Sequence, residues 1–170
     1  MKTYLVTGAA GFIGSNFLKY ILKKYDKVEE IEVIVVDSLT YAGNLATIKQ
    51  ELEDKRVEFE KVDIRDKKEI ERIFSENNID YVVNFAAESH VDRSIENPEI
   101  FLETNILGTQ NLLENAKKFW TIKKDENGYP VYKEGVKYLQ VSTDEVYGSL
   151  IKDYDEAIEL VIDDEAVREA

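Results

Sequence analysis

Short apolar runs alternate with longer segments of helical period along most of the chain. The apolar runs are residues 4–6, 31–36, 57–59, 79–87 and 136–142. This alternation is typical of βαβ units, whose parallel strands form a sheet with helices on both faces. We therefore expect an α/β fold, a Rossmann-like doubly wound parallel sheet of about five strands. The least polar run, residues 79–87, is expected at its centre.

The intervening segments carry the start and stop signals of helices. The expected helices are residues 12–25, a weaker one at 45–52, 67–76, a long one at about 98–119, and 152–170. Asn97 and Pro98 form an N-cap and first-turn pair at the start of the long helix. Residues 120–135 interrupt the alternation, and Asn127-Gly128 within them predicts a hairpin on the surface.

Composition excludes several classes of protein. Lys and Arg number 22 against 35 Asp and Glu, a net charge of −13 that opposes binding to nucleic acid. There is no cysteine and only one histidine, so we expect neither disulfides nor a metal site of thiolates or several histidines. No stretch of 18 apolar residues occurs, and we expect a cytoplasmic protein that neither spans a membrane nor is exported.

A glycine-rich turn joins the first strand to the first helix. Gly8, Gly11 and Gly14 are spaced G-x-x-G-x-x-G, one residue longer than the common G-x-G-x-x-G form. A pyrophosphate at this turn would meet the positive end of the helix dipole and its free N–H groups. The first glycine permits a tight turn, the second allows the phosphates to approach, and the third allows close helix packing. The alternative is a purely structural strand-to-helix turn.

An acidic residue at the end of the second strand strengthens the dinucleotide hypothesis. Asp37 follows Gly14 by 23 positions, near the offset at which a carboxylate binds the ribose 2′-hydroxyl of NAD. The same carboxylate would repel the 2′-phosphate of NADP. We therefore expect NAD as the cofactor.

Other strand ends are expected at the same crevice, because ligands of open α/β sheets bind at the carboxyl ends of the strands. Asp63 and Ile64 follow the third strand and are expected near the adenine. Ala86 and Ala87 end the fourth with side chains small enough for a cofactor to pass. The fifth strand is followed by Ser142, Thr143, Asp144 and Glu145, a candidate catalytic group beside the nicotinamide. Adjacent acids at a strand end are equally typical of a helix cap and turn.

Five motifs in order resemble those of the extended short-chain dehydrogenase/reductase family, most closely its dehydratases that act on dTDP-sugars. They are TGAAGFIG (7–14), DSLTYAGN (37–44), AAESHVDRS (86–94), TN (104–105) and STDEVYG (142–148). The resemblance covers residues 1 to about 150. It implies a lyase that oxidises a sugar nucleotide at C4 with NAD, eliminates water across C5 and C6, and returns the hydride to C6.

The resemblance also implies roles for individual residues. Asp144 would protonate the departing C6 hydroxyl, Glu145 would take the C5 proton, and Thr143 would hold the C4 oxygen. Ser89, His90 and Asn105 would contact the substrate, although a lone histidine is more often a structural hydrogen-bonding residue. Residues and resemblance together give the cofactor-binding set Gly8, Gly11, Phe12, Ile13, Gly14, Asp37, Ser38, Thr40, Gly43, Asp63, Ile64, Ala86, Ala87, Ser89, Thr104 and Ser142.

The family's tyrosine and lysine pair, four residues apart on the helix after the fifth strand, has no counterpart there. Tyr147 is followed at that spacing by Ile151, and Tyr154 by Ile158. Two pairs with the right spacing, Tyr20 with Lys24 and Tyr129 with Lys133, lie in the wrong parts of the chain. Family members are about twice as long, so we expect a chain shortened near residues 150–152, by engineering or by a split gene.

We therefore expect an NAD-binding domain at residues 1–151 and an acidic helix at 152–170 packed on it. Such a chain would bind NAD, and a dTDP-sugar by resemblance, without turning it over alone. Two alternatives remain: a stable scaffold that has lost ligand binding, and an active dehydratase completed by another chain. The family pairs as homodimers through two long helices, one of which is absent here. The apolar side chains of the tail are expected to cover part of the remaining helix, residues 98–119.

Overall fold

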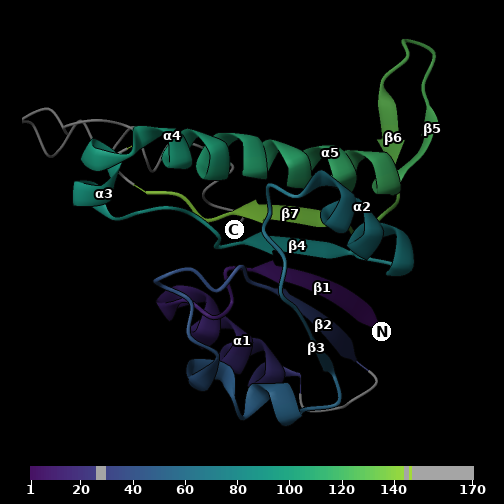
Figure 1. Cartoon of the computed structure of the whole chain (residues 1–170). Helices are drawn as coiled ribbons and strands as arrows, with labels where there is room; N and C mark the ends of the chain where they lie inside the picture. Colours follow the sequence, from purple (N-terminus) through teal and green to yellow (C-terminus); the bar gives the residue numbers. More distant parts are fainter. Residues whose placement is uncertain (26–29, 144–145, 147–170) are drawn as a thin grey trace, which may run out of the picture.

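Five parallel strands form the sheet of this computed structural model, which describes residues 1–25, 30–143 and 146 (Figure 1). The order is β3–β2–β1–β4–β7. Their bounds are β1 Lys2–Thr7, β2 Ile31–Val36, β3 Val57–Glu60, β4 Tyr81–Asn84 and β7 Lys137–Gln140. The chain builds outward from β1 to β3 and then returns to β4 on the other side of β1. The expected doubly wound α/β fold is confirmed, with its switch point between β1 and β4.

The fourth strand differs from the prediction in place and length. β1 is in the middle of the sheet, and β4 lies beside it, between β1 and β7. β4 ends at Asn84, where it pairs with Thr7, the last residue of β1. The glycine turn begins directly after Thr7, so β4 has no backbone left to pair with on that side. Residues 85–87, predicted as strand, therefore leave the sheet as a loop.

One face of the sheet is covered by α1 (Phe12–Lys24) and by two 3₁₀ turns, η1 (Leu45–Ile48) and η2 (Glu51–Glu53). Leu18 and Ile21 of α1 are buried against Val33 and Val35 of β2 in one apolar cluster. The helix predicted at 45–52 forms only these short turns. The Asn44 side chain accepts a hydrogen bond from the N–H of Ala46 (3.0 Å), which caps the first of them.

The opposite face is covered by α2 (Lys67–Glu76) and α5 (Thr109–Trp120) (Figure 1). Ile70 and Ile73 of α2 and Leu112 of α5 are fully buried in a second apolar cluster with β1, β2 and β4. The indole N–H of Trp120 donates to the carbonyl of Ile79 (2.8 Å), which fixes the end of α5 below the sheet's amino edge. Helices thus lie on both faces of the sheet, although on the α1 side those of the described residues leave part of β4 and β7 uncovered.

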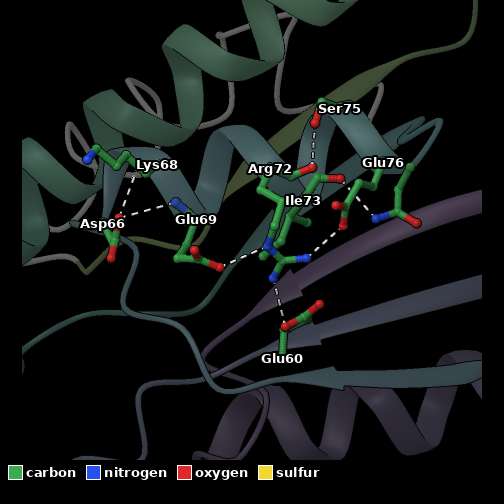
Figure 2. Close-up of polar contacts among 9 residues, drawn as sticks. Glu60, Asp66, Lys68, Glu69, Arg72, Ile73, Ser75 and Glu76 are labelled. Carbon is green, nitrogen blue, oxygen red and sulfur yellow. Dashed lines mark hydrogen bonds and ion pairs between the residues drawn. The ribbon is translucent and has the colours of Figure 1, made fainter.

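Figure 2 shows how polar contacts fix α2 on the sheet. Asp66 caps the helix, because its carboxylate accepts from the N–H groups of Lys68 and Glu69. Arg72 bonds Glu69 (2.8 Å) and Glu76 (2.7 Å) on its own helix and Glu60 of β3 (3.0 Å). These hydrogen bonds raise the pKa of the Arg72 guanidinium further above its ordinary value. Arg72 therefore joins the helix to the edge strand.

The long predicted helix is present as a nearly continuous run from α4 (Pro98–Phe101) through a π-helical segment, η3 (Leu102–Gly108), into α5. A short helix, α3 (Val91–Glu96), precedes it. Asn97 occupies the N-cap position, but its side chain forms no capping hydrogen bond, contrary to the prediction. Pro98 starts the helix without that bond because its fixed φ suits the first turn and it has no N–H to satisfy.

The predicted hairpin is formed by β5 (Thr121–Lys124) and β6 (Pro130–Tyr132), which pair antiparallel. In its loop, the Asp125 carboxylate accepts from the N–H groups of Asn127 and Tyr129, and Gly128 has a φ of +84°. The Lys133 ammonium bonds Asn78 (2.9 Å) and Asp80 (3.3 Å) and so ties the hairpin to the sheet.

The expectations for membrane spans, metal sites and the C-terminal helix are taken together. No helix within residues 1–25 and 30–143 is long and apolar enough to cross a bilayer. The same residues hold no group of three acidic or histidine side chains that would bind a metal. The helix predicted at 152–170 lies outside the described residues.

Candidate functional site

A cleft of about 350 Å³ lies at the carboxyl ends of the strands, where β1 and β4 diverge. It is lined by the glycine turn and by the segments that follow β2, β3 and β4. The lining residues are Gly8, Gly11, Phe12, Ile13, Gly14, Val36, Asp37, Ser38, Thr40, Ala42, Gly43, Val62, Asp63, Ile64, Arg65, Phe85, Ala86, Ala87, Glu88, Ser89, Ile100, Thr104 and Val141. This is the position at which open α/β sheets bind ligands.

The glycine turn leaves no room for side chains at two of its glycines. Gly8 has a φ of +66°, and a Cβ there would lie 2.6 Å from the backbone nitrogen of Ala86. A Cβ on Gly14 would overlap the carbonyl oxygen of Gly8. The turn therefore packs backbone against backbone, both on the β4 loop and on the first turn of α1. Any larger residue at either place would push the turn into the cleft or off the sheet.

The first turn of α1 presents N–H groups without a side-chain acceptor. Gly11 is the N-cap residue, so no side chain caps the helix, and its first turn contains no acidic residue. Phe12, Ile13 and Gly14 follow and line the cleft. Unsatisfied N–H groups and the positive end of the helix dipole together suit an anion such as a phosphate. The turn therefore fits the pyrophosphate of a dinucleotide.

Asp37 is held rigidly at the end of β2. One carboxylate oxygen accepts from the N–H of Ala10 (2.9 Å) and the other from the N–H of Leu39 (2.8 Å). Leu39 has a positive φ of 55°, and a Cβ on Gly43 would lie 2.6 Å from Asp37 Oδ1, so the loop closes tightly on the carboxylate. Each oxygen retains a second lone pair. A ligand hydroxyl in the cleft can therefore still be bound.

Asn84 fixes the loop that begins at the end of β4. It is fully buried, accepts a short hydrogen bond from the Thr7 hydroxyl and donates to the side chain of Gln140 (2.9 Å). The N–H of Ala86 donates back to Asn84 Oδ1 (3.2 Å). Strands β1, β4 and β7 are thus joined by one polar network directly below the cleft. That network keeps Ala86 against Gly8.

Arg65 adds a positive charge beside the residues that follow β3. Its guanidinium bonds Asp63 (2.8 Å) and Glu103 of η3 (2.6 Å). Burial raises the pKa of Asp63, but the hydrogen bonds and charge of Arg65 outweigh it and hold the pKa below its ordinary value. Asp63 is therefore ionised at neutral pH and fixed in place.

The loop after β4 is held by Asn105, whose side-chain amide bonds the N–H and the carbonyl of Glu88 (both 2.8 Å). Glu88 is 8% exposed, and within the described residues its Oε2 has no hydrogen-bond partner. At the rim, the Arg93 guanidinium lies 4.0 Å from the centre of the Tyr41 ring, and the His90 ring meets the same ring edge-on. Burial, the negative charge of Glu88 and a hydrogen bond to it raise the pKa of Tyr41.

The cleft gathers most of the predicted cofactor residues. Of that set, only Ser142 is not in its lining. Among the predicted substrate residues, Ser89 lines the cleft, His90 packs on Tyr41 at the rim, and Asn105 bonds the Glu88 backbone. Thr143 is exposed and outside the lining, and Asp144 and Glu145 lie outside the described residues.

Some cleft residues were not predicted. Arg65 directly follows Asp63-Ile64, and a basic residue at a strand end is a signal that sequence analysis could have used. Glu88 lies within the motif AAESHVDRS (86–94), but its position in the cleft depends on the hydrogen bond of its backbone to Asn105, 17 residues away. Ile100 and Val62 give no signal, because an apolar residue facing a cleft has the same pattern as one facing the core.

A glycine turn that enters a helix and a fixed acid after the second strand meet at the switch point of a doubly wound parallel sheet. The fold is therefore of the Rossmann type, and its cleft fits a dinucleotide. The sequence model of one family, GDP-mannose 4,6 dehydratase, matches residues 5–159. The chain belongs to this family.

Individual relatives agree with that assignment. The chain is 46% identical to dTDP-glucose 4,6-dehydratase of Salmonella typhimurium over 146 residues, 86% of this chain and 38% of the relative. The identity to the enzyme of the same name from Neisseria meningitidis serogroup B is 44%, over 88% of this chain and 40% of the relative. The chain thus spans about two fifths of the length of these relatives.

Solved structures of dehydratases and of an epimerase share this fold. A dTDP-glucose 4,6-dehydratase from Bacillus anthracis, in complex with NAD, superimposes with a TM-score of 0.69 at 40% identity, over 89% of this chain and 41% of the other. DesIV of Streptomyces venezuelae, a dTDP-glucose 4,6-dehydratase with NAD and TYD bound, superimposes with a TM-score of 0.63 at 49% identity. The match covers 69% of this chain and 36% of the other. UDP-glucose 4-epimerase of Thermotoga maritima, with UDP-glucose, superimposes with a TM-score of 0.67 at 32% identity. The match covers 88% of this chain and 41% of the other.

Proposed function

We propose that this chain is the NAD-binding part of a dTDP-glucose 4,6-dehydratase. The observation that carries the proposal is the glycine turn, where Gly8 and Gly14 have no room for a Cβ and α1 starts without a side-chain cap. The dTDP-glucose 4,6-dehydratases named above support the particular activity, since the two of known structure were solved with NAD.

In this proposal, the elements of the cleft bind different parts of NAD. The N–H groups of the first turn of α1 bind the pyrophosphate. Asp37 accepts hydrogen bonds from the ribose hydroxyls and disfavours a 2′-phosphate in its place. Asp63 and Ile64 contact the adenine, and the small Ala86 and Ala87 let the rest of the cofactor lie along the β4 loop.

The residues proposed for the chemistry come after β7 in the sequence. A bound nicotinamide would supply hydride chemistry, as acceptor from C4 of the sugar and as donor to C6. Asp144 protonates the C6 hydroxyl as it leaves, Glu145 takes the C5 proton, and Thr143 holds the C4 oxygen. Adjacent carboxyls in a desolvated site push their pKa values apart, which suits one acid and one base. Ser89, His90 and Asn105 belong to the sugar-nucleotide side.

The base for C4 oxidation is not among these 170 residues, because no Tyr-x-x-x-Lys pair follows β7. We therefore expect NAD binding without turnover by this chain alone. The test is a calorimetric titration with NAD, together with incubation with dTDP-glucose and NAD followed for a 4-keto product. Binding without product supports the proposal. Product above background would mean an active dehydratase completed between chains, and the absence of binding would mean an inert scaffold.

The remaining parts of the proposal concern location and assembly. A chain without cysteine suits a reducing compartment such as the cytoplasm. Leu102, Ile106, Leu107 and Leu113 of η3 and α5 are all exposed, between 45% and 58%. Several exposed apolar side chains along one helical run favour self-association. Sedimentation over a range of concentrations tests this, and a monomer at every concentration would contradict it.

A further inference from the structure

A second hollow, of about 320 Å³, lies on the face of β4 and β7 opposite α5. Tyr138 packs against the core below α2 and α5, so its neighbours Lys137 and Leu139 face the other way. Tyr81 of β4 and Tyr4 of β1 continue this surface toward α1. We call it the tyrosine groove. It does not belong to the cleft, which lies at the carboxyl ends of the strands.

The tyrosine groove is a face of a parallel sheet without a covering helix in the described part of the chain. Parallel strands are normally covered on both faces. Here Leu139 is 53% exposed and Tyr20, on the side of α1 that borders the groove, is 58% exposed. An apolar sheet face of this kind requires an occupant.

The rim of the groove is positively charged. Lys24, at the end of α1, and Lys137, at the start of β7, both line it. The Lys24 ammonium lies 5.7 Å from the ring centres of both Tyr20 and Tyr25. Neither Lys24 nor Lys137 forms an ion pair with another described residue. The occupant that this rim fits is therefore apolar on one side and acidic on the other.

We propose that the occupant is the C-terminal segment of this same chain, residues 152–170. This segment has eight acidic and two basic residues, and Ala157, Ile158, Val161 and Ile162 recur in it at helical spacing. As a helix it would be about 28 Å long, whereas the four residues of β4 extend for only about 13 Å. The segment therefore spans the groove with acidic residues to reach both lysines.

The connection to the groove is short enough. The chain leaves β7 at Gln140, and the eleven residues 141–151 can extend for up to about 35 Å. A helix that follows a strand back along the face of its own sheet is the usual arrangement of this architecture. The other candidate surface, the exposed apolar stripe of η3 and α5, is edged by charges of both signs, with Glu103 and Glu114 as well as Lys117 and Lys118, and Glu103 is already paired with Arg65. It therefore lacks the positive rim that an acidic helix meets at the groove.

Cysteine trapping tests the proposal, because the natural chain has no cysteine. The test variant carries Leu139→Cys and Ile158→Cys. The control carries Leu113→Cys and Ile158→Cys, because Leu113 is 45% exposed on α5 and so matches Leu139 in exposure. Both are oxidised at low protein concentration, and intramolecular disulfide formation is followed by mass spectrometry. A tethered but undocked tail would already favour the Leu139 pair by about fourfold, because that pair closes a loop of 19 residues rather than 45 and effective concentration falls roughly as the −3/2 power of loop length.

We expect the Leu139 pair to close at least about tenfold faster than the Leu113 pair, because a disulfide needs close and defined geometry. Adding Lys24→Glu and Lys137→Glu should remove most of that advantage. The matched change Lys123→Glu and Lys124→Glu, in the hairpin, should leave it intact. An advantage of about fourfold or less for the Leu139 pair, or insensitivity of its rate to the groove lysines, would overturn the proposal. None of these outcomes depends on NAD binding, so the function proposed above is tested separately.

Discussion

The two halves of the sheet differ sharply in how completely they are enclosed. Five of the six residues of β2 are buried, whereas none of the four residues of β7 is. β2 has neighbours at both edges and apolar clusters on both faces, but β7 pairs only with β4 and is covered on one face within the described residues. The half built around β1 and β2 therefore provides most of the stability. The cleft lies where this half meets the more open one.

The largest effect expected from this comparison is on stability. Ile34 of β2 is 1% exposed, and replacing it with alanine removes buried apolar contacts and leaves a cavity, at a cost of about 3–5 kcal/mol. Replacing Leu139 of β7, which is half exposed within the described residues, should cost clearly less, about 1–2 kcal/mol, which includes its contacts with a tail docked in the tyrosine groove. Urea unfolding of both variants measures the difference. Equal costs would show that β7 is as well enclosed as β2.

The glycine turn gives the next effect. Gly8→Ala brings a Cβ into the Ala86 backbone at a positive φ and should cost about 2–4 kcal/mol, with NAD binding lost. Gly128→Ala is the matched control, since Gly128 also has a positive φ but has no atom within 4 Å of the added Cβ. It should cost only about 1–2 kcal/mol and leave NAD binding unchanged. Similar losses in both variants would mean that φ alone, and not the close approach to β4, requires glycine.

Asp37 tests the site at the junction of the two halves. Asp37→Asn should weaken NAD binding by about 10- to 100-fold, because a hydrogen bond to a charged group is lost. It should also reduce the preference for NAD over NADP, which a purely structural role for Asp37 would not do. Asp66→Asn, at the cap of α2 outside the cleft, is the control with the same change of charge. Calorimetric titration with both cofactors gives the affinities, and an unchanged ratio of the two would contradict the assignment.

The smallest effect concerns Arg65, which pairs with Asp63 beside it and with Glu103 of η3 and so joins the end of β3 to the helical layer. The pKa of Asp63 is lowered in the folded state, so the pair stabilises the fold above the carboxyl's unfolded pKa and the contribution is lost as the pH falls through the folded value. Both side chains are about one-third exposed, so solvent screens the pair. Arg65→Gln should reduce the free energy of unfolding by at most about 1 kcal/mol at pH 6, and this cost should shrink as the pH falls below about 4, the ordinary pKa of the carboxyl. A cost that stayed constant across this range in urea unfolding would exclude the ion pair as its cause.

Helices and strands whose apolar residues recur at regular spacing were predictable from the sequence. Contacts between distant segments were not. Residues 31–36 and 67–76 form the strand and helix with the predicted bounds because their apolar residues alone define a face. The segment 45–52 has a weaker pattern, and the Asn44 cap supports only a 3₁₀ turn.

The candidate site follows the same division. The glycines and Asp37 were predictable because a phosphate and a ribose impose residue types at fixed spacing. The hydrogen bonds of Asn105 with Glu88, and of Arg65 with Glu103 38 residues later, depend on where the π-helical segment lies beside the strand ends. No local pattern in the sequence specifies that placement.

The position of β1 at the centre of the sheet sets the order in which a ribosome can complete this fold. β1 is synthesised first and pairs with β2 within about 30 residues, but its other partner, β4, pairs Tyr81 with Tyr4. At roughly 5–20 residues per second, those 77 residues take about 4–15 s to appear. During that time one edge of β1 is unpaired and able to pair with other chains. Nascent chains halted before residue 81 should therefore bind chaperones more strongly than chains halted after β7 has emerged.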